Sequence, residues 1–574
     1  MAKQKKLSVT SLQEKAKKLL SKGELPGARD VYQQACELAP EDASVWFELA
    51  ETNWKLGDIQ AAEKACRQAL SLDQNLYQAH INLGQMAVSR GEWALAEKHQ
   101  RAYLSSQPNN VKAYLDLGLT LERQGKLEES EQLYRQALSL DNTSAELHTV
   151  LSRVLRDQGR LDEASNSLEC ALRSQPDFAQ IYCEMGCLFR ARKQYDVALK
   201  SFHRFAQLAP QKQKSFLFHA TEVLIDQERY EDALNYYDKA LSVMPQEADI
   251  RYGRAQLLLS MGRLDEGWRE QEWRLSWPYW QRDHAFGYDG LRPLWQGEPL
   301  QGKKILVYAE QGYGDTIQFS RYLPMLSQMG GAVYFHCRSE LYELFASSFP
   351  GLAGIATNDI DKVVQSEYDY YVPIMSLARF FSPTIDSIPS ETPYLHVDNK
   401  RLAYWRERLP QDRFKVGVVW AGAGNNPRDK RRSLHVQNLA PLANIKEVEW
   451  YSLQKWTQSQ SLIHDGVPLV FTNLGGDIYD FSDTAAIIKN LDLVICVDTS
   501  VAHLAGALGC PTWVLIYNGP DWRWLRGRQD SPWYSTMRLF RQGVGEEWMP
   551  VVERVASALK EEAVAKSTKL TVHE

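Results

Sequence analysis

Long apolar segments are missing from this 574-residue chain. No run approaches the ~18 apolar residues that a membrane-spanning helix needs, so we expect no transmembrane segment. The basic start at residues 1–6 is not followed by an apolar stretch, which argues against a signal peptide. Cysteines are few, eight in all, and none forms a CxxC pair, which argues against a disulfide framework. These absences together favour a protein of the reducing cytoplasm.

A strong charge imbalance is absent as well. The formal net charge is −6 at pH 7, which argues against a general nucleic-acid binder. Cys183 and Cys187 lie one helical turn apart, but no histidine stands in register with them, so we interpret them as buried small residues and not as metal ligands. We therefore predict a function without a resident metal or cofactor.

The first half of the chain contains a 34-residue period. Glycines mark it at Gly23, Gly57, Gly91, Gly125 and Gly159, and the register continues through Lys193 and Glu228 to Gly262. Small residues recur five positions after and seven positions before these sites. Glycine permits a tight turn between helices, and small residues let the two helices of a unit pack closely. The pattern resembles the tetratricopeptide repeat, so we predict an α-solenoid of about eight repeats over residues 8–275.

Stacked repeats of this type form a superhelix with a concave face, and that face usually holds a peptide or a protein. The inner positions of this array read Glu48, Asn82, Asp116, Val150, Glu184 and His219. The acidic members of this set indicate a basic or polar partner. Two alternatives stay open, in which the array is only a spacer or a dimerisation surface.

Tryptophans crowd into the segment that follows the repeats. Residues 276–302 contain Trp277, Trp280 and Trp295. Because large amphipathic aromatics bury area on both sides of a boundary, we predict a packed bridge here; a carbohydrate platform is the alternative. Beyond it, strands alternate with helices, which predicts two parallel-sheet α/β domains, at residues 303–395 and 413–560, with a cleft between them.

Two strand-to-helix turns carry the polar residues of these domains. The strand Lys304–Tyr308 leads to Gly312, Gly314 and Asp315, where the glycines let a ligand approach the backbone. The strand Leu493–Val497 leads to a helix start with four polar residues, Asp498, Thr499, Ser500 and His503. The free N–H groups and the positive dipole end of such a helix bind anions. The alternative is an ordinary capped helix at each turn.

The order of these pieces resembles the GT-B glycosyltransferases, which have two Rossmann-like domains. The turn at residues 310–315 and the motif at residues 498–509 are similar to glycosyltransferase family 9, the heptosyltransferases, and to its bacterial repeat-fused relatives. More distantly, the chain resembles the O-linked N-acetylglucosamine transferases, which carry the same repeats. The resemblance covers residues 291–542 of the α/β half and implies a glycosyltransferase of hexosyl or heptosyl type.

The resemblance also implies roles for single residues. Asp315 matches the aspartate that is the proposed general base of the family. The donor motif at the diphosphate is matched by Asp498, Thr499, Ser500 and His503. The basic cluster Lys430, Arg431 and Arg432 stands where the family places a phosphate-binding lysine. Which of these three takes that role stays open.

The residue types themselves fit nucleotide-sugar chemistry. A leaving diphosphate gathers negative charge, which fixed cations and helix N–H groups stabilise without a metal. Asp315 can take the proton of an acceptor hydroxyl from the opposite domain, which gives inversion by one in-line displacement. Further candidates are Glu310 and His435 as reserve bases, Gln454 and Lys455 as nucleotide contacts, and Trp522 and Trp524 as walls of the cleft or parts of the core. The Asp-x-Asp at residues 359–361 lies in a polar loop away from the donor motif, so we expect no metal site there.

We therefore expect an α-solenoid followed by a GT-B fold, acting as a metal-independent, inverting glycosyltransferase. It would move a sugar from a nucleotide-sugar donor to an acceptor, a protein or peptide recruited by the repeat array. Two rival functions stay open: a repeat scaffold that binds a nucleotide sugar without turnover, and a sugar-nucleotide epimerase.

Overall fold

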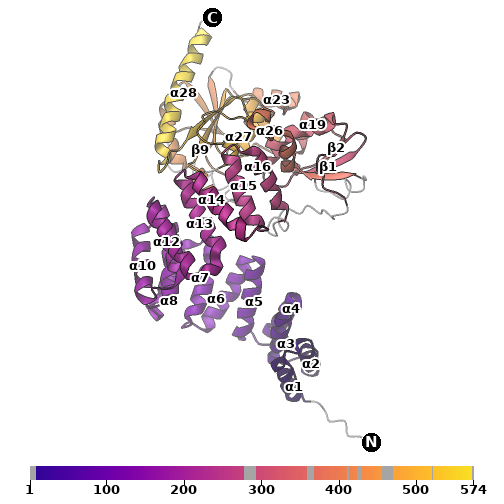
Figure 1. Cartoon of the computed structure of the whole chain (residues 1–574), viewed down its shortest axis with the longest axis vertical. Helices are drawn as coiled ribbons and strands as arrows, with labels where there is room; N and C mark the ends of the chain where they lie inside the picture. The colour runs from indigo at the N-terminus through magenta and orange to yellow at the C-terminus, as the bar shows by residue number, and fades with distance from the viewer. Residues whose placement is uncertain are drawn as a thin grey trace. The chain divides into compact units, whose positions relative to one another are not determined.

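The computed structural model describes residues 8–276, 292–357, 368–409, 413–422, 429–455, 469–519 and 521–571. Its contacts divide the chain into two compact units, Met1–Ala220 and Thr221–Glu574. The first unit is helical, and the second combines helices with two sheets (Figure 1). Among the described residues, every helix is either too short or too polar to traverse a lipid bilayer.

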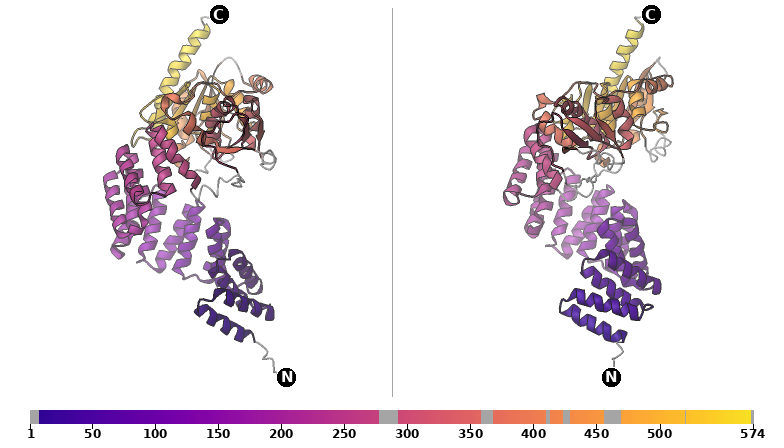
Figure 2. Two further views of the ribbon diagram at one scale, coloured as in Figure 1. Left: turned by 45° about the vertical axis from the view of Figure 1, so that its right-hand side comes forward. Right: turned by 90° about the vertical axis from the view of Figure 1, so that its right-hand side faces the viewer.

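The first unit consists of antiparallel helix pairs that stack one after another (Figure 2). Its helices are α1 (Val9–Ser21), α2 (Leu25–Leu38), α3 (Ala43–Lys55), α4 (Ile59–Leu72), α5 (Tyr77–Arg90), α6 (Trp93–Ser106), α7 (Val111–Arg123), α8 (Leu127–Leu140), α9 (Ala145–Asp157), α10 (Leu161–Ser174), α11 (Ala179–Ala191), α12 (Tyr195–Leu208), η1 (Pro210–Lys212) and the first part of α13 (Gln213–Asp226). The predicted tetratricopeptide-type solenoid is therefore present.

The turns inside the pairs explain the 34-residue period. The five glycines from Gly23 to Gly159 have φ angles between 73° and 80°, a left-handed conformation that glycine adopts without strain. Lys193 and Glu228 stand at the same register positions and have φ angles of 60° and 59°. The backbone conformation is thus kept where the glycine is lost, and the register is confirmed.

Small residues in the array make room for large ones across the helix pair. A Cβ atom at Gly118 would collide with the ring of Tyr134, and one at Gly186 would collide with the ring of Phe202. Both aromatic side chains are fully buried. Close-packed interiors leave no room for such an added atom, so the small residues set the spacing of the helices.

The second unit begins with helices that continue the repeats. They are the last part of α13, then α14 (Tyr230–Val243), α15 (Ala248–Ser260), α16 (Leu264–Gln271) and η2 (Glu272–Ser276). Trp268 on α16 donates its indole N–H to the carbonyl of Ser382 at 2.9 Å and packs edge-on against Trp522, with ring centroids 5.1 Å apart. These buried contacts tie the last repeat to the α/β part of the same unit.

Only part of the predicted tryptophan-rich bridge lies within the described residues. Trp295 is buried and donates its indole N–H to the carbonyl of Glu298 at 2.9 Å. Trp277 and Trp280 lie outside the described residues. The predicted bridge at residues 276–302 therefore stays a prediction.

Two parallel sheets form the α/β part of the second unit. Within the described residues, the first has the order β3-β2-β1-β4 and the second the order β10-β9-β8-β5-β6-β7. The strands are β1 (Lys304–Tyr308), β2 (Ala332–His336), β3 (Gly354–Ala356), β4 (Tyr370–Pro373), β5 (Phe414–Val419), β6 (Val448–Ser452), β7 (Thr472–Asn473), β8 (Leu493–Val497), β9 (Thr512–Ile516) and β10 (Met537–Arg541). Every residue of β5, β8 and β9 is buried, as expected of strands covered on both faces.

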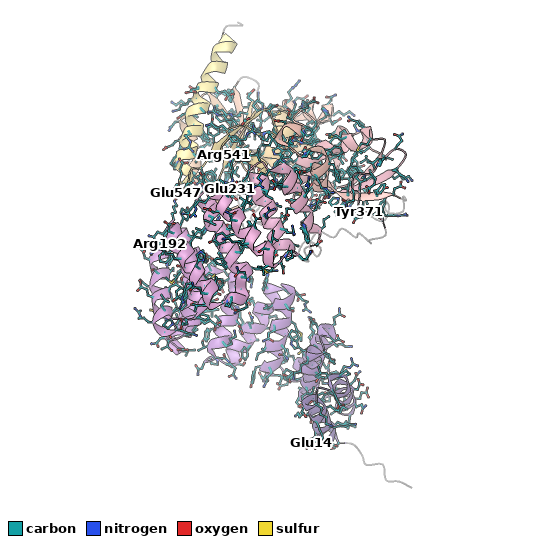
Figure 3. The ribbon with its side chains drawn as sticks, viewed as in Figure 1. Glu14, Arg192, Glu231, Tyr371, Arg541 and Glu547 are labelled. Atoms are coloured by element: carbon teal, nitrogen blue, oxygen red, sulfur yellow. The ribbon has the colours of Figure 1, made fainter. Side chains whose placement is uncertain are left out.

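The four-stranded sheet is held by neighbouring strands in parallel register. Tyr371, labelled in Figure 3, lies on β4, and its ring stacks with that of Tyr308 on β1 at 6.3 Å. Leu294 adds a parallel bridge to Tyr371 at the edge of this sheet. The predicted bridge thus contributes at least one residue, Leu294, to the edge of this sheet.

Helices lie between the strands, and one longer helix follows the last strand. Those between β1 and β5 in the chain are α18 (Tyr313–Phe319), η3 (Ser320–Tyr322), α19 (Leu323–Gln328), η4 (Ser339–Leu341), α20 (Tyr342–Ser348), η5 (Ile374–Leu377), α22 (Ala378–Phe381), η6 (Ile385–Ser387) and α23 (Asn399–Arg406). Those after β5 are α24 (Asp429–Arg432), η7 (Val436–Asn444), α26 (Phe481–Lys489), α27 (Ser500–Ala507), η8 (Trp522–Trp524) and the longer α28 (Trp548–Thr571). Helices α18 and α27 pack against each other, so the two turns singled out in the sequence meet.

Candidate functional site

A cavity of about 980 Å³ lies where the turns of the two sheets meet. The loops that follow β1, β5, β6, β8 and β9 contribute to its wall, as expected for the carboxyl edge of parallel sheets. Ten of the predicted site residues line it: Gly312, Gly314, Asp315, Arg432, Gln454, Lys455, Asp498, Thr499, Ser500 and His503. The fold thus brings together residues that are almost 200 positions apart in the sequence.

The start of α27 presents unused polar groups to this cavity. Thr499 is its N-cap residue, with φ −142° and ψ 174°, and its side chain makes no capping hydrogen bond. The Thr499 Oγ1 atom is buried and has no hydrogen-bond partner. Buried polar atoms are nearly always paired, so an orphaned hydroxyl beside free helix N–H groups suits an anionic ligand.

Asp498 stands between this helix and the arginine of the basic cluster. Its carboxylate is buried, and its Oδ2 atom lies 3.9 Å from Nη1 of Arg432. Burial, and then the charge of Asp521, raise the pKa of Asp498 to about 6, and the nearby arginines only partly offset this. A carboxyl group that is half protonated at about pH 6 thus lines the cavity.

The basic cluster is divided by the structure. Arg432 lines the cavity and is anchored by Asp429, whose Oδ1 accepts from the arginine Nε at 2.6 Å. Arg431 is exposed and absent from the cavity wall; its Nη1 lies 3.9 Å from Oε2 of Glu222. The side chain of Lys430 lies outside the described part of the structure. Arg432 is therefore the member of the cluster that the structure places at the cavity.

Asp315 is not a free carboxylate. It accepts a hydrogen bond from the guanidinium of Arg523, which also contacts Asp521 at 3.1 Å. The side chains of Asp315, Arg523 and Asp521 are only 14%, 13% and 11% exposed. Burial lowers the pKa of Arg523, but the charges of Asp315 and Asp521 outweigh it and raise that pKa above its ordinary value.

Arg523 and Asp521 were missed at the sequence level. They follow β9 in a loop whose Trp-Arg-Trp sequence matches no motif. The available signal was their position after a buried parallel strand, because loops at that edge carry ligand-binding residues in such sheets. Both residues line the same cavity as Asp315.

His503 is held as a neutral ring at the back of the cavity. Its Nδ1 atom lies 3.0 Å from the hydroxyl of Tyr534, and its ring stacks on Trp524 at 5.2 Å. Burial, and then the charge of Arg523, lower the pKa of His503 to about 3. A Cβ atom at Gly314 would lie 2.8 Å from its Cδ2 atom, so only glycine lets α18 approach α27 this closely.

Gln454 and Lys455 have partners within the protein. The Gln454 amide accepts from the Ala421 N–H at 3.2 Å and donates to the Ala421 carbonyl at 3.0 Å. Lys455 donates to the carbonyl of Tyr479 at 2.9 Å. Both residues line the cavity while they fix its loops, and their contact with a nucleotide stays a prediction.

The reserve bases lie away from the cavity. Glu310 is fully buried and receives two hydrogen bonds of 2.8 Å from Arg274 and one of 3.1 Å from the Met375 N–H. His435 is exposed and does not line the cavity. Glu310 is therefore part of a buried ion pair, and its candidacy as a base loses its support.

The remaining aromatic and acidic candidates do not line the cavity or lie outside the described residues. Trp522 and Trp524 are buried, and neither lines the cavity, so the core-packing interpretation is the one that the structure supports. Asp359 and Asp361 lie outside the described residues.

The acidic inner positions of the repeat array have partners within the protein. Glu48 pairs with Lys17 at 2.8 Å. Asp116 and Glu184 likewise meet cations of the chain, at 2.9 Å and 2.6 Å, so the acidic inner positions carry less free charge than the sequence suggests.

The last repeat contributes to the same cavity. Tyr252 and Gln256, one turn apart on α15, line it, and α15 packs against η8, which carries Arg523. Gln256 donates to the side chain of Gln271 on α16 at 2.8 Å, which orients its amide. A molecule in this cavity would therefore contact residues of the repeats as well as those of both sheets.

Two families match separate parts of the chain. Residues 9–256 match the Cilia and flagella-associated protein 70 C-terminal domain, and residues 457–519 match Glycosyltransferase family 9 (heptosyltransferase). Protein FlbA of Caulobacter vibrioides is 28% identical over 338 residues, which are 55% of this chain and 56% of that protein. The chain thus spans about half the length of the curated relative that it matches.

Solved structures of tetratricopeptide repeat proteins are similar to part of this chain. A tetratricopeptide repeat protein from Parabacteroides merdae is 18% identical, with 41% of this chain and 92% of that one covered and a TM-score of 0.36. YrrB, a tetratricopeptide repeat protein with an unusual peptide-binding site, is 20% identical, with 31% and 92% covered and a TM-score of 0.28. The family matches show that tetratricopeptide-type repeats precede a segment similar to glycosyltransferase family 9.

Proposed function

We propose that this protein is a glycosyltransferase that moves a sugar from a nucleotide-sugar donor to an acceptor, with its α/β part in the GT-B arrangement. One observation carries the proposal: a single cavity gathers the start of α27, Arg432 and Asp315 from two parallel sheets. The family 9 match at residues 457–519 supports it, since that segment ends just after β9. The proposed domains are residues 8–275, 276–302, 303–395 and 413–560.

The donor diphosphate would lie at the start of α27. The unpaired Thr499 hydroxyl and the first helix N–H groups would donate to its oxygens. Arg432, already fixed by Asp429, would add a charge-assisted bond as negative charge gathers on the leaving group. These groups supply the stabilisation that a metal would otherwise provide, so we propose a metal-independent reaction.

Asp315 would act as the base. The acceptor hydroxyl would give its proton to this carboxylate while its oxygen bonds to the anomeric carbon, and the bond to the diphosphate would break on the opposite side. One in-line displacement inverts the configuration at that carbon. Arg523 would keep Asp315 in place and, being buried beside it, would also lie near the departing charge.

The acceptor would be a protein or peptide recruited by the repeats. The supporting observation is that Tyr252 and Gln256, on a repeat helix, line the same cavity as Asp315. We also propose a cytoplasmic location, because all eight cysteines are free, as in a reducing compartment.

A non-catalytic nucleotide-sugar binder is the second candidate. It is favoured by the Asp315–Arg523 pair, because an arginine of the protein already occupies the carboxylate that the transferase proposal uses as the base. The two candidates share the donor site and differ only in turnover.

The test is a thermal-shift screen with UDP-, GDP-, ADP- and dTDP-sugars in EDTA, followed by an assay for release of the nucleoside diphosphate. A donor present at 100 times its Kd should add about 2.7 kcal/mol of stability. We expect Asp315→Asn to bind the donor as the wild type does and to release at least about 100-fold less product. Binding with no turnover by the wild type would identify the binder, and acceptor-free conversion of the donor would identify an epimerase. No shift with any donor would refute the proposal.

A further inference from the structure

Three soft ligand atoms meet on the repeat array, far in sequence from the cavity. Cys183 and Cys187 lie on α11, and His219 lies on α13, the first helix of the next pair. Their sulfur and nitrogen atoms all lie within 4.8 Å of one another. The Cys187 Sγ atom is 4.0 Å from Nδ1 of His219. The histidine that the sequence seemed to lack is thus supplied by the neighbouring repeat.

The spacing is close to that of a metal site. In a tetrahedral zinc site, with Zn–S of about 2.3 Å and Zn–N of about 2.0–2.1 Å, ligand atoms lie about 3.5–3.8 Å apart. The observed separations, all within 4.8 Å, exceed this range by no more than about 1.3 Å, a difference that rotation of the cysteine and histidine side chains can close. Within the described ranges, no other group of three or more such side chains converges in this way.

The surroundings hold the ligands without closing the site. The His219 ring stacks on Phe202, with centroids 5.0 Å apart and planes 4° apart, which fixes its orientation. Cys183 is buried, whereas Cys187 and His219 are half-buried, so an ion can reach them. A fourth coordination position can therefore be filled by water or by a partner.

The local charge also suits a divalent ion. Arg156 is paired with Glu184, the residue next to Cys183, at 2.6 Å and with Asp157 at 2.9 Å, so its charge is compensated. Two thiolates then neutralise a divalent ion, and the histidine stays uncharged. Sulfur ligands with one imidazole favour zinc over magnesium or calcium, which prefer oxygen ligands.

We propose that Cys183, Cys187 and His219 bind a thiophilic divalent metal ion of the zinc class, with one position open. The ion would cross-link two successive repeats through α11 and α13. This site is separate from the proposed transferase cavity and does not rest on that proposal.

The test is a titration of the reduced, full-length protein with Co²⁺ alone, a spectroscopic stand-in for zinc, followed by displacement with Zn²⁺. We expect a near-ultraviolet sulfur-to-cobalt charge-transfer band that saturates at one ion per chain and disappears when Zn²⁺ is added. Cys187→Ser and His219→Asn should weaken binding by more than about 100-fold, because loss of a direct ligand costs more than loss of an outer partner. Cys170→Ser, which removes a partly exposed cysteine outside the cluster, should leave the band unchanged.

The sulfur band keeps other histidines from being mistaken for this site. His80 and His99 form a close pair, 3.0 Å between Nδ1 atoms, but they cannot produce a sulfur transition. If Cys187→Ser fails to fold, His219→Asn still tests the proposal, because His219 is half-buried, and circular dichroism verifies the fold of that variant. The proposal is overturned if the wild type shows no sulfur band, or if the band survives in both Cys187→Ser and His219→Asn.

Discussion

Replacement of Gly314 by alanine should damage the cavity through one added methyl group. The new Cβ would lie 2.8 Å from Cδ2 of His503 and 3.5 Å from the Cα of Ser500. Carbon atoms ordinarily approach no closer than about 3.5–4.0 Å, so the overlap with the histidine is roughly 0.7 Å or more. His503 cannot move aside, because it is stacked on Trp524 and bonded to Tyr534.

The displacement therefore falls on α18, which carries Asp315 as the next residue. Overpacking of this kind costs about 1–3 kcal/mol of stability. A shift of about 1 Å at a reacting group lowers the rate by about 100-fold. We expect Gly314→Ala to lower the unfolding free energy, measured in urea, by about 1–3 kcal/mol. We also expect it to release nucleoside diphosphate from the donor about 100-fold more slowly than the wild type.

Gly312→Ala is the matched control for stability. Its Cβ would meet only Oδ2 of Asp315, at 3.5 Å, and its φ of −70° suits any residue. We expect its urea midpoint to equal that of the wild type. Wild-type stability and turnover in Gly314→Ala, or equal damage in Gly312→Ala, would refute the argument that the two helices meet through this glycine.

Three further predictions concern buried charges. Arg523→Met should lower the unfolding free energy by about 3–5 kcal/mol in urea titrations, because it leaves two buried carboxylates, Asp315 and Asp521, without their cation. An unchanged urea midpoint would show that water solvates these carboxylates. The pKa of Asp498 in the folded protein, about 6, lies above its ordinary 3.8, so the wild type loses stability as the pH rises through about 6. Asp498→Asn should therefore be more stable than the wild type by at most about 3 kcal/mol at pH 8, and by almost nothing at pH 4. Glu310→Gln should lower the unfolding free energy by about 3 kcal/mol, because it leaves the buried Arg274 without its carboxylate, while turnover per folded molecule stays at the wild-type level. A loss of turnover like that of Asp315→Asn would restore Glu310 as a candidate base.

The repeat array was predictable because its pattern is strictly periodic. The turn conformation recurs every 34 residues, and it persists at Lys193 and Glu228 although neither is glycine. Parallel strands were also predictable, since β8 and β9 are short, fully apolar runs between turn residues. The boundaries of elements were less predictable. The strand-to-helix turn at Asp315 indicates one continuous helix, whereas the structure has three short ones, α18, η3 and α19, with Pro324 at the start of α19.

The candidate site was predictable only where a local pattern carries it. Thr499 and His503 follow a strand and open a helix, a pattern that a single stretch of sequence can show. Arg523 could not be identified from the sequence, because its role depends on contact with Asp315, which lies 208 positions earlier and approaches it only in the folded chain. His219 escaped for the same reason, since its cysteine partners belong to the previous repeat.

Glu310 illustrates the opposite error. In the sequence it stands at the end of a strand and beside a glycine turn, as a catalytic carboxylate would. In the folded chain it points into the core, where Arg274 and the backbone of Met375 use its oxygens. Direction and partners of a side chain depend on tertiary packing, which the strand pattern does not contain.

The central claim is that α27 and Arg432 bind a diphosphate while Asp315 faces it from the other sheet. The most direct measurement is a crystal structure of the protein with the nucleoside diphosphate of the donor found by screening. We predict phosphate oxygens within about 3 Å of Thr499 Oγ1 and of the first N–H groups of α27, with Arg432 in contact. A diphosphate bound elsewhere, or one that leaves the Thr499 hydroxyl unpaired, would contradict the account.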